Sequence, residues 1–595
     1  MSKTKVNKNF IWAKAFVNQL CDLGVRFACI SPGSRSTPLT LAFAEQKKIK
    51  CFVHIDERVS GFFAIGLAKA CGLPVAIVTT SGTATAELYP AIIEAYQQRI
   101  PLIICTADRP PELLNTGANQ TINQWNLYKN HIRWFKYIGL PQLSVKRIIN
   151  LQKIAVRSFE TSLIKNKGPV HLNFPFRKPL EPNSFTDEVE DEILMTIKNT
   201  ISPEANINRQ ENLSKRETKQ INKIAENIIR NEKGLIIVGP KEYDQDFVSK
   251  LKLLSKITGY PILADGVSHL RFKTSVSDKN ICCNYNAYLR SQKFKNNNKP
   301  GIILQFGRTV TSVFLQNYIK QSKPLRFIIN EYGDLFGPSK SSKVFKFNPV
   351  TFCENLIRVL TESKFKRSHN WLKNINKVEI LTEEIKTLLL KKSNLKIEPK
   401  IFSELISIIP SNTKIMVGNS LPIRDFDNFA GKTDKNLKLF FNRGASGIDG
   451  VTSTALGIAS IEKPTILITG DLSFIHDLNA LLPAKKYSIP LVVILINNNG
   501  GGIFEMLPIS SEKNLFNTFF KTPHNLNISS LVKSYGLGHH LIKGTKDFQN
   551  KLKSSLLKKS LTVLEINTDS SLSKKIRKKY WADVVNKIES DFSLK

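Results

Sequence analysis

Short apolar runs alternate with amphipathic helical patterns in the first 185 residues. Each run ends in a loop rich in Gly, Pro or Ser, and the stretches between runs carry apolar residues at helical spacing. We predict a helix from Arg58 to Cys71 and strands at Val25–Ile30, Cys51–Ile55, Val75–Val78 and Pro101–Thr106. Continuous apolar strands that alternate with helices are typical of a parallel sheet covered on both faces.

The same alternation returns twice further along the chain. Strands are predicted in a middle unit at Gly234–Val238, Pro261–Ala264, Gly301–Phe306 and Leu325–Ile329, and in a C-terminal unit at Lys414–Val417, Lys438–Phe441, Pro464–Thr469, Pro490–Ile496 and Leu561–Ile566. Polar stretches separate the units, so we predict domains over 1–185, 231–370 and 401–595, a linker with a lead-in helix over 186–230, and a second linker over 371–400. The predicted fold class is α/β, with three doubly wound parallel-sheet domains. The basic tail from Ser570 to Lys595 is predicted as a packed terminal helix.

The composition is that of an ordinary globular protein. Hydrophobic residues make up 42% and charged residues 23%, which excludes a disordered or coiled-coil chain. No apolar run approaches the roughly 18 residues that a membrane-spanning helix needs. Polar residues interrupt Phe10–Leu20, which favours an amphipathic helix over a signal peptide. The eight cysteines form no C-x-x-C pair, so we expect buried, reduced thiols. These features together indicate a cytoplasmic protein without a membrane span.

The net charge of +37 has three interpretations: a nucleic-acid partner, a coding bias, and a pocket for several anions that depends on the particular arginines discussed below. Clustered Lys and Arg bind nucleic-acid phosphates, so a basic nucleic-acid-binding protein is one alternative. The basic residues are scattered, however, and no aromatic-interleaved stripe or zinc-finger spacing accompanies them. The chain is also rich in Lys, Asn and Ile together, which is typical of an A/T-rich coding bias. We therefore expect no nucleic-acid partner.

The most informative residues follow two apolar runs of the C-terminal unit. Asp471 lies two residues after the first run ends at Thr469, and Asn498 follows the second run, 27 residues after Asp471. Because the carboxyl ends of parallel strands meet at one edge of a sheet, we expect both side-chain oxygens to reach one point. Carboxylate, amide and backbone carbonyl oxygens suit Mg²⁺, and the glycines of Gly500–Gly502 let the backbone approach a diphosphate closely. For either half alone, a capped helix or a glycine turn is the alternative.

Asp471 and Asn498 at this spacing resemble the thiamine diphosphate motif, an acidic residue followed by nearly thirty residues and a double asparagine. Within that superfamily, several segments resemble the family of 2-succinyl-5-enolpyruvyl-6-hydroxy-3-cyclohexene-1-carboxylate synthases of menaquinone and phylloquinone biosynthesis. They cover the first and third units in family order and are Ser31–Pro38, Asp56–Arg58, Thr80–Ala84, Ala107–Leu113, Asn115–Gln120, Asn442–Gly450 and Asn498–Phe504. The middle unit matches by layout more than by motif.

The resemblance implies thiamine diphosphate with Mg²⁺ or Mn²⁺, a pyrimidine-binding first domain and a diphosphate-binding third domain. Glu57 would be the catalytic residue that contacts the aminopyrimidine, because a carboxyl group in a mostly apolar site keeps a raised pKa and can share a proton with a ring nitrogen. The alternative for Glu57 is a surface glutamate in a first helical turn. Ile448 would support the bent cofactor, with core packing as its alternative. The implied cofactor set is Glu57, Ser420, Ile448, Gly470, Asp471, Leu472, Ser473, Asn498 and Gly500, with Asp471, Asn498 and Gly500 as metal ligands.

The resemblance also implies a reaction and its substrates. Such a carboligase decarboxylates 2-oxoglutarate and adds the succinyl carbanion equivalent 1,4 to isochorismate. Each substrate carries two carboxylates, and guanidinium groups bind carboxylates bidentately. Arg35, Arg109, Arg424 and Arg443 all fall in loops predicted to follow strands. By resemblance, Ser420, Arg424 and Arg443 hold the succinyl side, and Ser34, Arg35, Arg109, Asn119 and Gln120 face isochorismate. Family members pair the first and third domains across subunits, which implies a homodimer or homotetramer.

One departure from the family concerns the middle domain. The family has a lysine that contributes to isochorismate binding, whereas here Val313 follows Thr311 and Ser312, with Arg308 nearby as a possible substitute. The alternatives within the superfamily are an acetolactate-synthase-like enzyme and a 2-oxoacid decarboxylase. The arginine set and the Gly470-Asp471-Leu472 sequence argue against both. A scaffold that binds no cofactor is a further alternative, and thiamine diphosphate would not raise its melting temperature.

Overall fold

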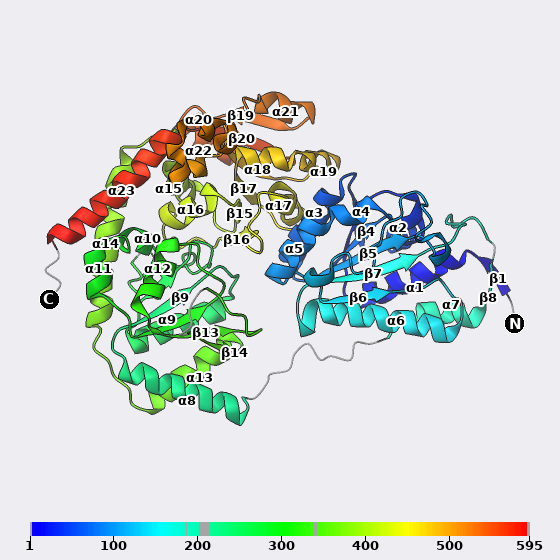
Figure 1. The fold of residues 1–595 in the computed structure, drawn as a ribbon, viewed down its shortest axis with the longest axis horizontal. Helices are drawn as coiled ribbons and strands as arrows, with labels where there is room; N and C mark the ends of the chain where they lie inside the picture. The colour runs from blue at the N-terminus through cyan, green and yellow to red at the C-terminus, as the bar shows by residue number, and fades with distance from the viewer. Residues whose placement is uncertain (1–2, 186, 202–212, 276, 338–341, 592–595) are drawn as a thin grey trace.

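The computed structural model describes residues 3–185, 187–201, 213–275, 277–337 and 342–591. They form three six-stranded sheets, each with helices on its faces (Figure 1). All pairs of neighbouring strands within these sheets are parallel. The predicted α/β fold class with three parallel-sheet domains is confirmed. Figure 1 shows the N-terminal domain on one side and the middle and C-terminal domains stacked on the other.

The N-terminal sheet has the strand order β3-β2-β4-β5-β7-β6. Its strands are β2 (Phe27–Ile30), β3 (Lys50–Val53), β4 (Val75–Thr79), β5 (Leu102–Asp108), β6 (Trp134–Tyr137) and β7 (Pro169–Pro175). Its helices are α1 (Lys8–Asp22), α2 (Thr37–Glu45), α3 (Glu57–Cys71), α4 (Thr83–Glu87), α5 (Tyr89–Gln98) and α6 (Val145–Glu160). A small antiparallel pair, β1 (Lys3–Val6) with β8 (Asp187–Glu190), and helix α7 (Asp191–Lys198) flank this domain.

The middle sheet has the order β11-β10-β9-β12-β13-β14. Its strands are β9 (Gly234–Val238), β10 (Ile262–Ala264), β11 (Ile281–Cys282), β12 (Ile302–Phe306), β13 (Leu325–Asn330) and β14 (Ser342–Lys346). Its helices are α8 (Lys215–Arg230), α9 (Gln245–Thr258), α10 (Tyr285–Tyr288), α11 (Gln292–Asn297), α12 (Val313–Ser322) and α13 (Pro349–Glu362).

The two segments predicted as linkers contain ordered elements. Over 371–400, which is predicted as a linker, α14 (Asn370–Lys391) fills most of the segment and α15 (Glu398–Ile408) begins before it ends. Trp371, Ile375 and Val378 are buried along one face of α14, so the abundant lysines of this stretch conceal a helical apolar stripe. Within 186–230 the structure shows β8, α7 and α8, while residues 186 and 202–212 lie outside the described part of the chain.

The C-terminal sheet has the order β16-β15-β17-β18-β20-β19. Its strands are β15 (Lys414–Val417), β16 (Lys438–Phe441), β17 (Thr465–Gly470), β18 (Val492–Asn497), β19 (Gly538–Leu541) and β20 (Thr562–Asn567). Its helices are α16 (Leu421–Phe429), α17 (Val451–Ala459), α18 (Asp471–His476), α19 (Leu481–Lys486), α20 (Lys513–Phe516), α21 (Ile528–Ser534), α22 (Thr545–Leu556) and α23 (Ser570–Asp591). The predicted terminal helix is confirmed over Ser570–Asp591, and residues 592–595 lie outside the described part of the chain. Helix α23 packs against α10 and α14 and thereby joins the C-terminal and middle domains (Figure 1).

Helices α3 and α17 join the N-terminal and C-terminal domains. A Cβ atom at Gly66 would lie 2.1 Å from the carbonyl oxygen of Thr454, and one at Gly457 would lie 2.2 Å from that of Phe63. The two helix backbones therefore approach closely at positions where only glycine fits.

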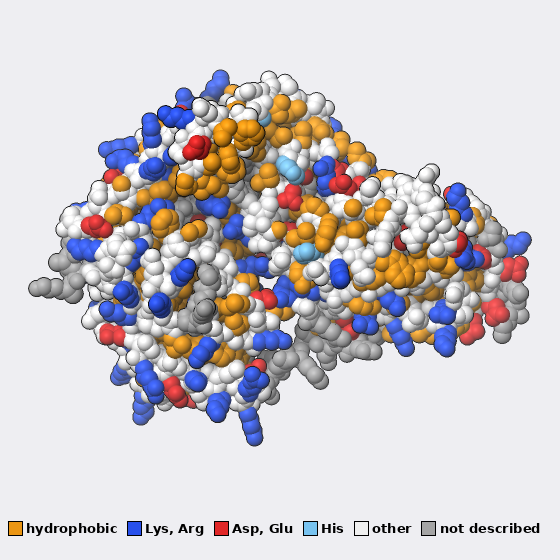
Figure 2. Space-filling view, viewed as in Figure 1, with side chains coloured by type: hydrophobic (Ala, Val, Ile, Leu, Met, Phe, Trp, Pro, Cys, Tyr) orange, Lys and Arg blue, Asp and Glu red, His pale blue; other side chains and the backbone are white. Residues whose placement is uncertain are grey.

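On the face drawn in Figure 2, Lys and Arg side chains are spread over the whole molecule. Every helix of the described residues is too short or too polar to cross a bilayer.

Candidate active site

A cavity of about 170 Å³ opens beyond the carboxyl ends of β15, β17 and β18. Parallel sheets present their ligands at this edge. Eight of the nine residues that the sequence assigns to the cofactor line this cavity, and Glu57 does not. The eight are Ser420, Ile448, Gly470, Asp471, Leu472, Ser473, Asn498 and Gly500.

Asp471 is the buried acid of the cavity. Strand β17 ends at Gly470 and α18 begins at Asp471, and β17 pairs directly with β18. The Oδ2 atom of Asp471 accepts hydrogen bonds from the backbone N–H groups of Asn498 at 3.2 Å and Gly500 at 2.9 Å. Burial raises the pKa of this carboxyl group, while the backbone N–H groups of Gly500 and Leu472 favour its charged form. The two strand ends therefore lie together in the structure, as their spacing in the sequence predicts.

Asn498 presents an unsatisfied oxygen beside that carboxylate. Its Oδ1 atom is buried and has no hydrogen-bond partner, while its Nδ2 donates to Oε1 of Glu398 at 2.8 Å. A buried acceptor without a donor costs about 1–3 kcal/mol, and a cation would satisfy it. No group of three or more His, Cys, Asp or Glu side chains in the described residues is arranged to hold a metal. The set here is a carboxylate, an amide and backbone carbonyls, which suits a cation that also takes phosphate oxygens.

Glycine is required at the floor of the cavity. Gly500 has φ of +138°, and a Cβ atom there would lie 2.2 Å from the carbonyl oxygen of Lys521. A Cβ atom at Gly470 would meet no atom within 4 Å, so the backbone at Gly470 borders open space. The Ser473 hydroxyl donates to the Ile448 carbonyl at 2.8 Å and so fixes the loop that carries this isoleucine. The Ile448 side chain is 37% exposed, which argues against the core-packing alternative.

Glu57 is the first residue of α3 and is half-buried. Burial raises the pKa of its carboxyl group, as a proton-sharing role requires. Its neighbours Asp56 and Arg58 form a local ion pair at 2.8 Å. Glu57 does not line the cavity that contains Asp471. The described part of the single chain thus leaves the predicted catalytic glutamate apart from the other cofactor residues.

The N-terminal domain gathers the residues predicted to face isochorismate. Arg35 is buried, its Nη1 donates to the Phe176 carbonyl at 2.7 Å, and its Nε has no partner. Burial and the nearby charge of Arg109 lower the pKa of Arg35. Arg109 donates from Nη2 to the Asn119 carbonyl at 2.8 Å, and Gln120 packs next to Gly82. Ser34, Asn119 and Gln120 lie at the protein surface.

The residues predicted to hold the succinyl side lie beside the cavity. Arg424 donates from Nη1 to the Ser420 carbonyl at 2.6 Å, and Arg443 reaches Oδ1 of Asn419 at 3.4 Å. Desolvation and the charge of Arg443 lower the pKa of Arg424. The expectation of a loop position for Arg424 is wrong: it lies in the first turn of α16, which starts directly after Ser420 because Pro422 favours a helix start.

None of the four predicted arginines forms an ion pair with a described carboxylate; the arginine ion pairs among the described residues involve other arginines. Two like charges held close together without an anion are unfavourable. The arrangement is therefore suited to dicarboxylate ligands.

Sequence reasoning missed several residues of the site. Glu398, Asn419 and Phe504 also line the cavity, and His524 Nε2 lies 3.4 Å from Oδ2 of Asp471. Phe504 is the last residue of the family-like segment Asn498–Phe504, although it was given no role. Glu398, Asn419 and His524 come from segments with no motif, and only tertiary packing brings them here. In the middle domain, Val313 is exposed at the start of α12. Arg308 lines a separate cavity of about 250 Å³ between the three domains, and so does not reach the cofactor cavity.

Comparisons with known proteins identify the class of this enzyme. The family model described as the N-terminal TPP binding domain of thiamine pyrophosphate enzymes matches residues 12–127, the middle-domain model matches 196–417, and the C-terminal TPP binding domain matches 432–566. Two solved structures share the fold at 14% sequence identity and a TM-score of 0.68. They are a benzoylformate decarboxylase from Polynucleobacter necessarius and a 4-hydroxybenzoylformate decarboxylase from Rhodococcus jostii, and the matches cover 94% of this chain and 98% and 99% of theirs. The fold and the site thus define a thiamine diphosphate-dependent enzyme.

Curated relatives narrow the assignment from thiamine diphosphate-dependent enzymes in general to one family. The 2-succinyl-5-enolpyruvyl-6-hydroxy-3-cyclohexene-1-carboxylate synthase of Bacillus cytotoxicus is 36% identical over 97% of this chain and 96% of its own length. The enzyme of the same name from Trichodesmium erythraeum is 38% identical over 95% and 96%. That from Geobacillus kaustophilus is 36% identical over 97% and 98%. The chain belongs to the 2-succinyl-5-enolpyruvyl-6-hydroxy-3-cyclohexene-1-carboxylate synthase family, so the predicted family and transferase class are confirmed.

Proposed function

We propose that this chain decarboxylates 2-oxoglutarate and adds the resulting succinyl unit 1,4 to isochorismate. The observation that carries the proposal is the cavity in which Asp471 and the unsatisfied Oδ1 of Asn498 lie beside two arginines without carboxylate partners. When bound, thiamine diphosphate supplies the carbanion chemistry that replaces the lost carboxylate with a nucleophilic carbon. The protein positions the cofactor and the substrates, neutralises the substrate carboxylates and excludes water from the site.

The cation would be Mg²⁺ or Mn²⁺, held by Asp471, by Oδ1 of Asn498 and by the Gly500 carbonyl. Gly470, Leu472 and Ser473 border the same cavity and would meet the cofactor, and Ile448 would support it. The hydrogen bonds that hold the Asp471 carboxylate leave its geometry fixed before the cation arrives. The site is thus organised in advance for a diphosphate and its metal.

The arginines would hold the two substrates. Arg424 and Arg443, with Ser420, would take the carboxylates of the succinyl side, because they lie next to the cavity and next to each other. Arg35 and Arg109, with Ser34, Asn119 and Gln120, would face isochorismate. Since Arg308 lines a different cavity, we assign it no part in this site.

Glu57 implies a second copy of the chain. Glu57 does not line the cavity of its own chain, yet its raised pKa fits a proton exchange with the aminopyrimidine. We infer a homodimer or a homotetramer in which the N-terminal domain, 1–185, of one copy covers the C-terminal domain, 401–595, of another. In this arrangement the middle domain, 231–370, of each copy packs beside its own N-terminal and C-terminal domains. We expect this assembly in the cytoplasm.

Product analysis tests the proposal. The full chain would be incubated with thiamine diphosphate, Mg²⁺, 2-oxoglutarate and isochorismate, and the products would be identified by mass spectrometry. The proposal predicts one adduct that contains the isochorismate skeleton and a succinyl unit. Succinic semialdehyde as the main product, with isochorismate left intact, would indicate a 2-oxoacid decarboxylase instead.

A further inference from the structure

A buried ionic group lies directly behind the cofactor cavity. Arg577 of α23 is 3% exposed and lies between two carboxylates that are themselves buried, Glu398 of α15 and Asp425 of α16. Its Nε donates to Oδ1 of Asp425 at 2.9 Å, and its Nη2 contacts Oε2 of Glu398. Removal of one partner from such a group leaves an uncompensated buried charge, which is strongly destabilising, so the three side chains hold one another in place. The reaction outlined above uses neither Glu398 nor Arg577.

The other oxygen of Glu398 contacts a proposed metal ligand. Oε1 of Glu398 accepts from Nδ2 of Asn498 at 2.8 Å. A carboxylate has only acceptors, whereas an amide has a donor end and an acceptor end. Nδ2 must therefore point to Glu398, and Oδ1 must point away from it. That outward oxygen is the buried atom without a partner.

We propose that Glu398, held in place by Arg577, is a positioning residue that turns the Asn498 oxygen toward the cation. The inference rests on the proposed cation site and adds a residue that fixes the orientation of its amide ligand. Such outer partners orient ligands in many metal sites. Arg577 also holds Asp425, the neighbour of Arg424, so one guanidinium group supports both the metal side and the substrate side of the cavity.

Substitution of Glu398 by glutamine changes the orientation of the Asn498 amide while it keeps the size of the side chain at position 398. In Glu398→Gln the new amide oxygen would face Arg577, because a guanidinium group only donates, and the new NH₂ group would then face Asn498. Asn498 would have to rotate and present Nδ2 to the cation. We expect Glu398→Gln to weaken Mn²⁺ binding by about 10–100-fold, the range seen for outer partners of metal ligands.

Glu398→Gln should have a different effect on Mn²⁺ affinity when residue 498 is an aspartate. In an Asn498→Asp background both carboxylate oxygens accept, so the amide introduced by Glu398→Gln can donate to one oxygen and leave the other for the cation. We expect Glu398→Gln to leave Mn²⁺ affinity unchanged or higher in that background. A merely structural role of Glu398 would lower the affinity equally in both backgrounds.

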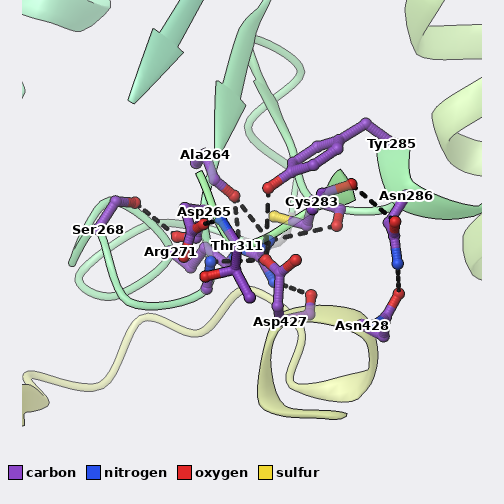
Figure 3. Close-up of polar contacts among 12 residues, drawn as sticks. Ala264, Asp265, Ser268, Arg271, Cys283, Tyr285, Asn286, Thr311, Asp427 and Asn428 are labelled. Carbon is purple, nitrogen blue, oxygen red and sulfur yellow. Dashed lines mark hydrogen bonds and ion pairs between the residues drawn. The ribbon is translucent and has the colours of Figure 1, made fainter. Parts of the chain in front are cut away.

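Asp427 offers a matched control. It lies on the same helix as Asp425, and its carboxylate accepts from the Gly266 N–H at 2.7 Å and pairs with buried Arg271 at 2.8 Å (Figure 3). Figure 3 shows this second network at the contact of α16 with the middle domain, and none of its labelled residues lines the cavity. Asp427→Asn should change stability and leave Mn²⁺ affinity as in the wild type.

The experiment measures free Mn²⁺ by electron paramagnetic resonance in titrations of the full chain with saturating thiamine diphosphate. Circular dichroism and the melting temperature without cofactor confirm that each variant folds. Weakened binding in Glu398→Gln, absent in the Asn498→Asp background, supports the inference. Equal affinity of wild type and Glu398→Gln, or equal losses in both backgrounds, overturns it. Absence of Mn²⁺ binding by the wild type would instead refute the proposed cation site.

Discussion

Removal of the Arg424 guanidinium group should raise the KM for 2-oxoglutarate without unfolding the protein. Arg424 forms no ion pair with a described carboxylate; the contact of its guanidinium group is the hydrogen bond from Nη1 to the Ser420 carbonyl. The substitution Arg424→Ala should therefore change the free energy of unfolding little. The substrate loses one charge-assisted contact, worth about 1.5–3 kcal/mol. At about 1.4 kcal/mol per factor of ten, KM should rise about 10- to 150-fold.

Steady-state kinetics with 2-oxoglutarate varied and isochorismate saturating would measure this effect. If Arg424 holds a non-reacting carboxylate equally in the ground and transition states, kcat changes little. Arg358→Ala is the matched control, since Arg358 is an arginine of the middle domain whose side chain donates to Asn355 on its own helix. Arg424→Lys should recover part of the affinity because it keeps the charge but not the planar fork. An unchanged KM in Arg424→Ala would refute the role assigned to this arginine.

Three further changes test other parts of the structure. Gly500→Ala places a Cβ atom 2.2 Å from the Lys521 carbonyl at φ of +138°, so it should abolish the rise in melting temperature caused by thiamine diphosphate. Glu57→Gln should leave the fold intact and reduce turnover by about 10²–10⁴-fold, the usual range of acid–base catalysis. Burial and the nearby Asp265 raise the pKa of Asp427 to about 7, above its unfolded value, so its contribution to stability is present at low pH and is lost as pH rises toward 7. Asp427→Asn should reduce the slope of unfolding free energy against pH between about 4 and 7.

Each of these predictions has a result that would contradict it. A normal cofactor-induced melting shift in Gly500→Ala would show that the glycine floor tolerates a side chain. Normal turnover in Glu57→Gln would exclude the catalytic role of that carboxyl group. Chemical denaturation of wild type and Asp427→Asn at several pH values should give different slopes, and parallel curves would mean that Asp427 does not titrate in this window.

Much of the fold follows from the sequence because buried parallel strands are continuous apolar runs. Strands β15 and β16 begin and end as predicted. Strand β7 is absent from the predictions, although it is fully buried, because His171 and Asn173 interrupt its apolar pattern. Both polar side chains hydrogen-bond to Thr106 of the neighbouring strand, a contact that the sequence does not reveal.

The candidate site is predictable where backbone topology alone brings residues together. Asp471 and Asn498 meet because their strands are neighbours and both end at the same edge. Glu398 and His524 reach the site through tertiary packing of segments without motifs, so no spacing indicates them. The sequence misplaces Arg424 in a loop because a single sequence defines helix boundaries poorly. Glu57 does not line the cavity of its own chain, and the proposed second copy of the chain would bring it there.

Carbon dioxide release from 2-oxoglutarate distinguishes a carboligase from a simple decarboxylase in one assay. The assay would contain the full chain with Mg²⁺ and thiamine diphosphate, and would compare rates with and without isochorismate. For a carboligase we expect release that requires both cofactors, rises sharply when isochorismate is present and matches the loss of isochorismate one for one. Release at the same rate without isochorismate would contradict the carboligase assignment.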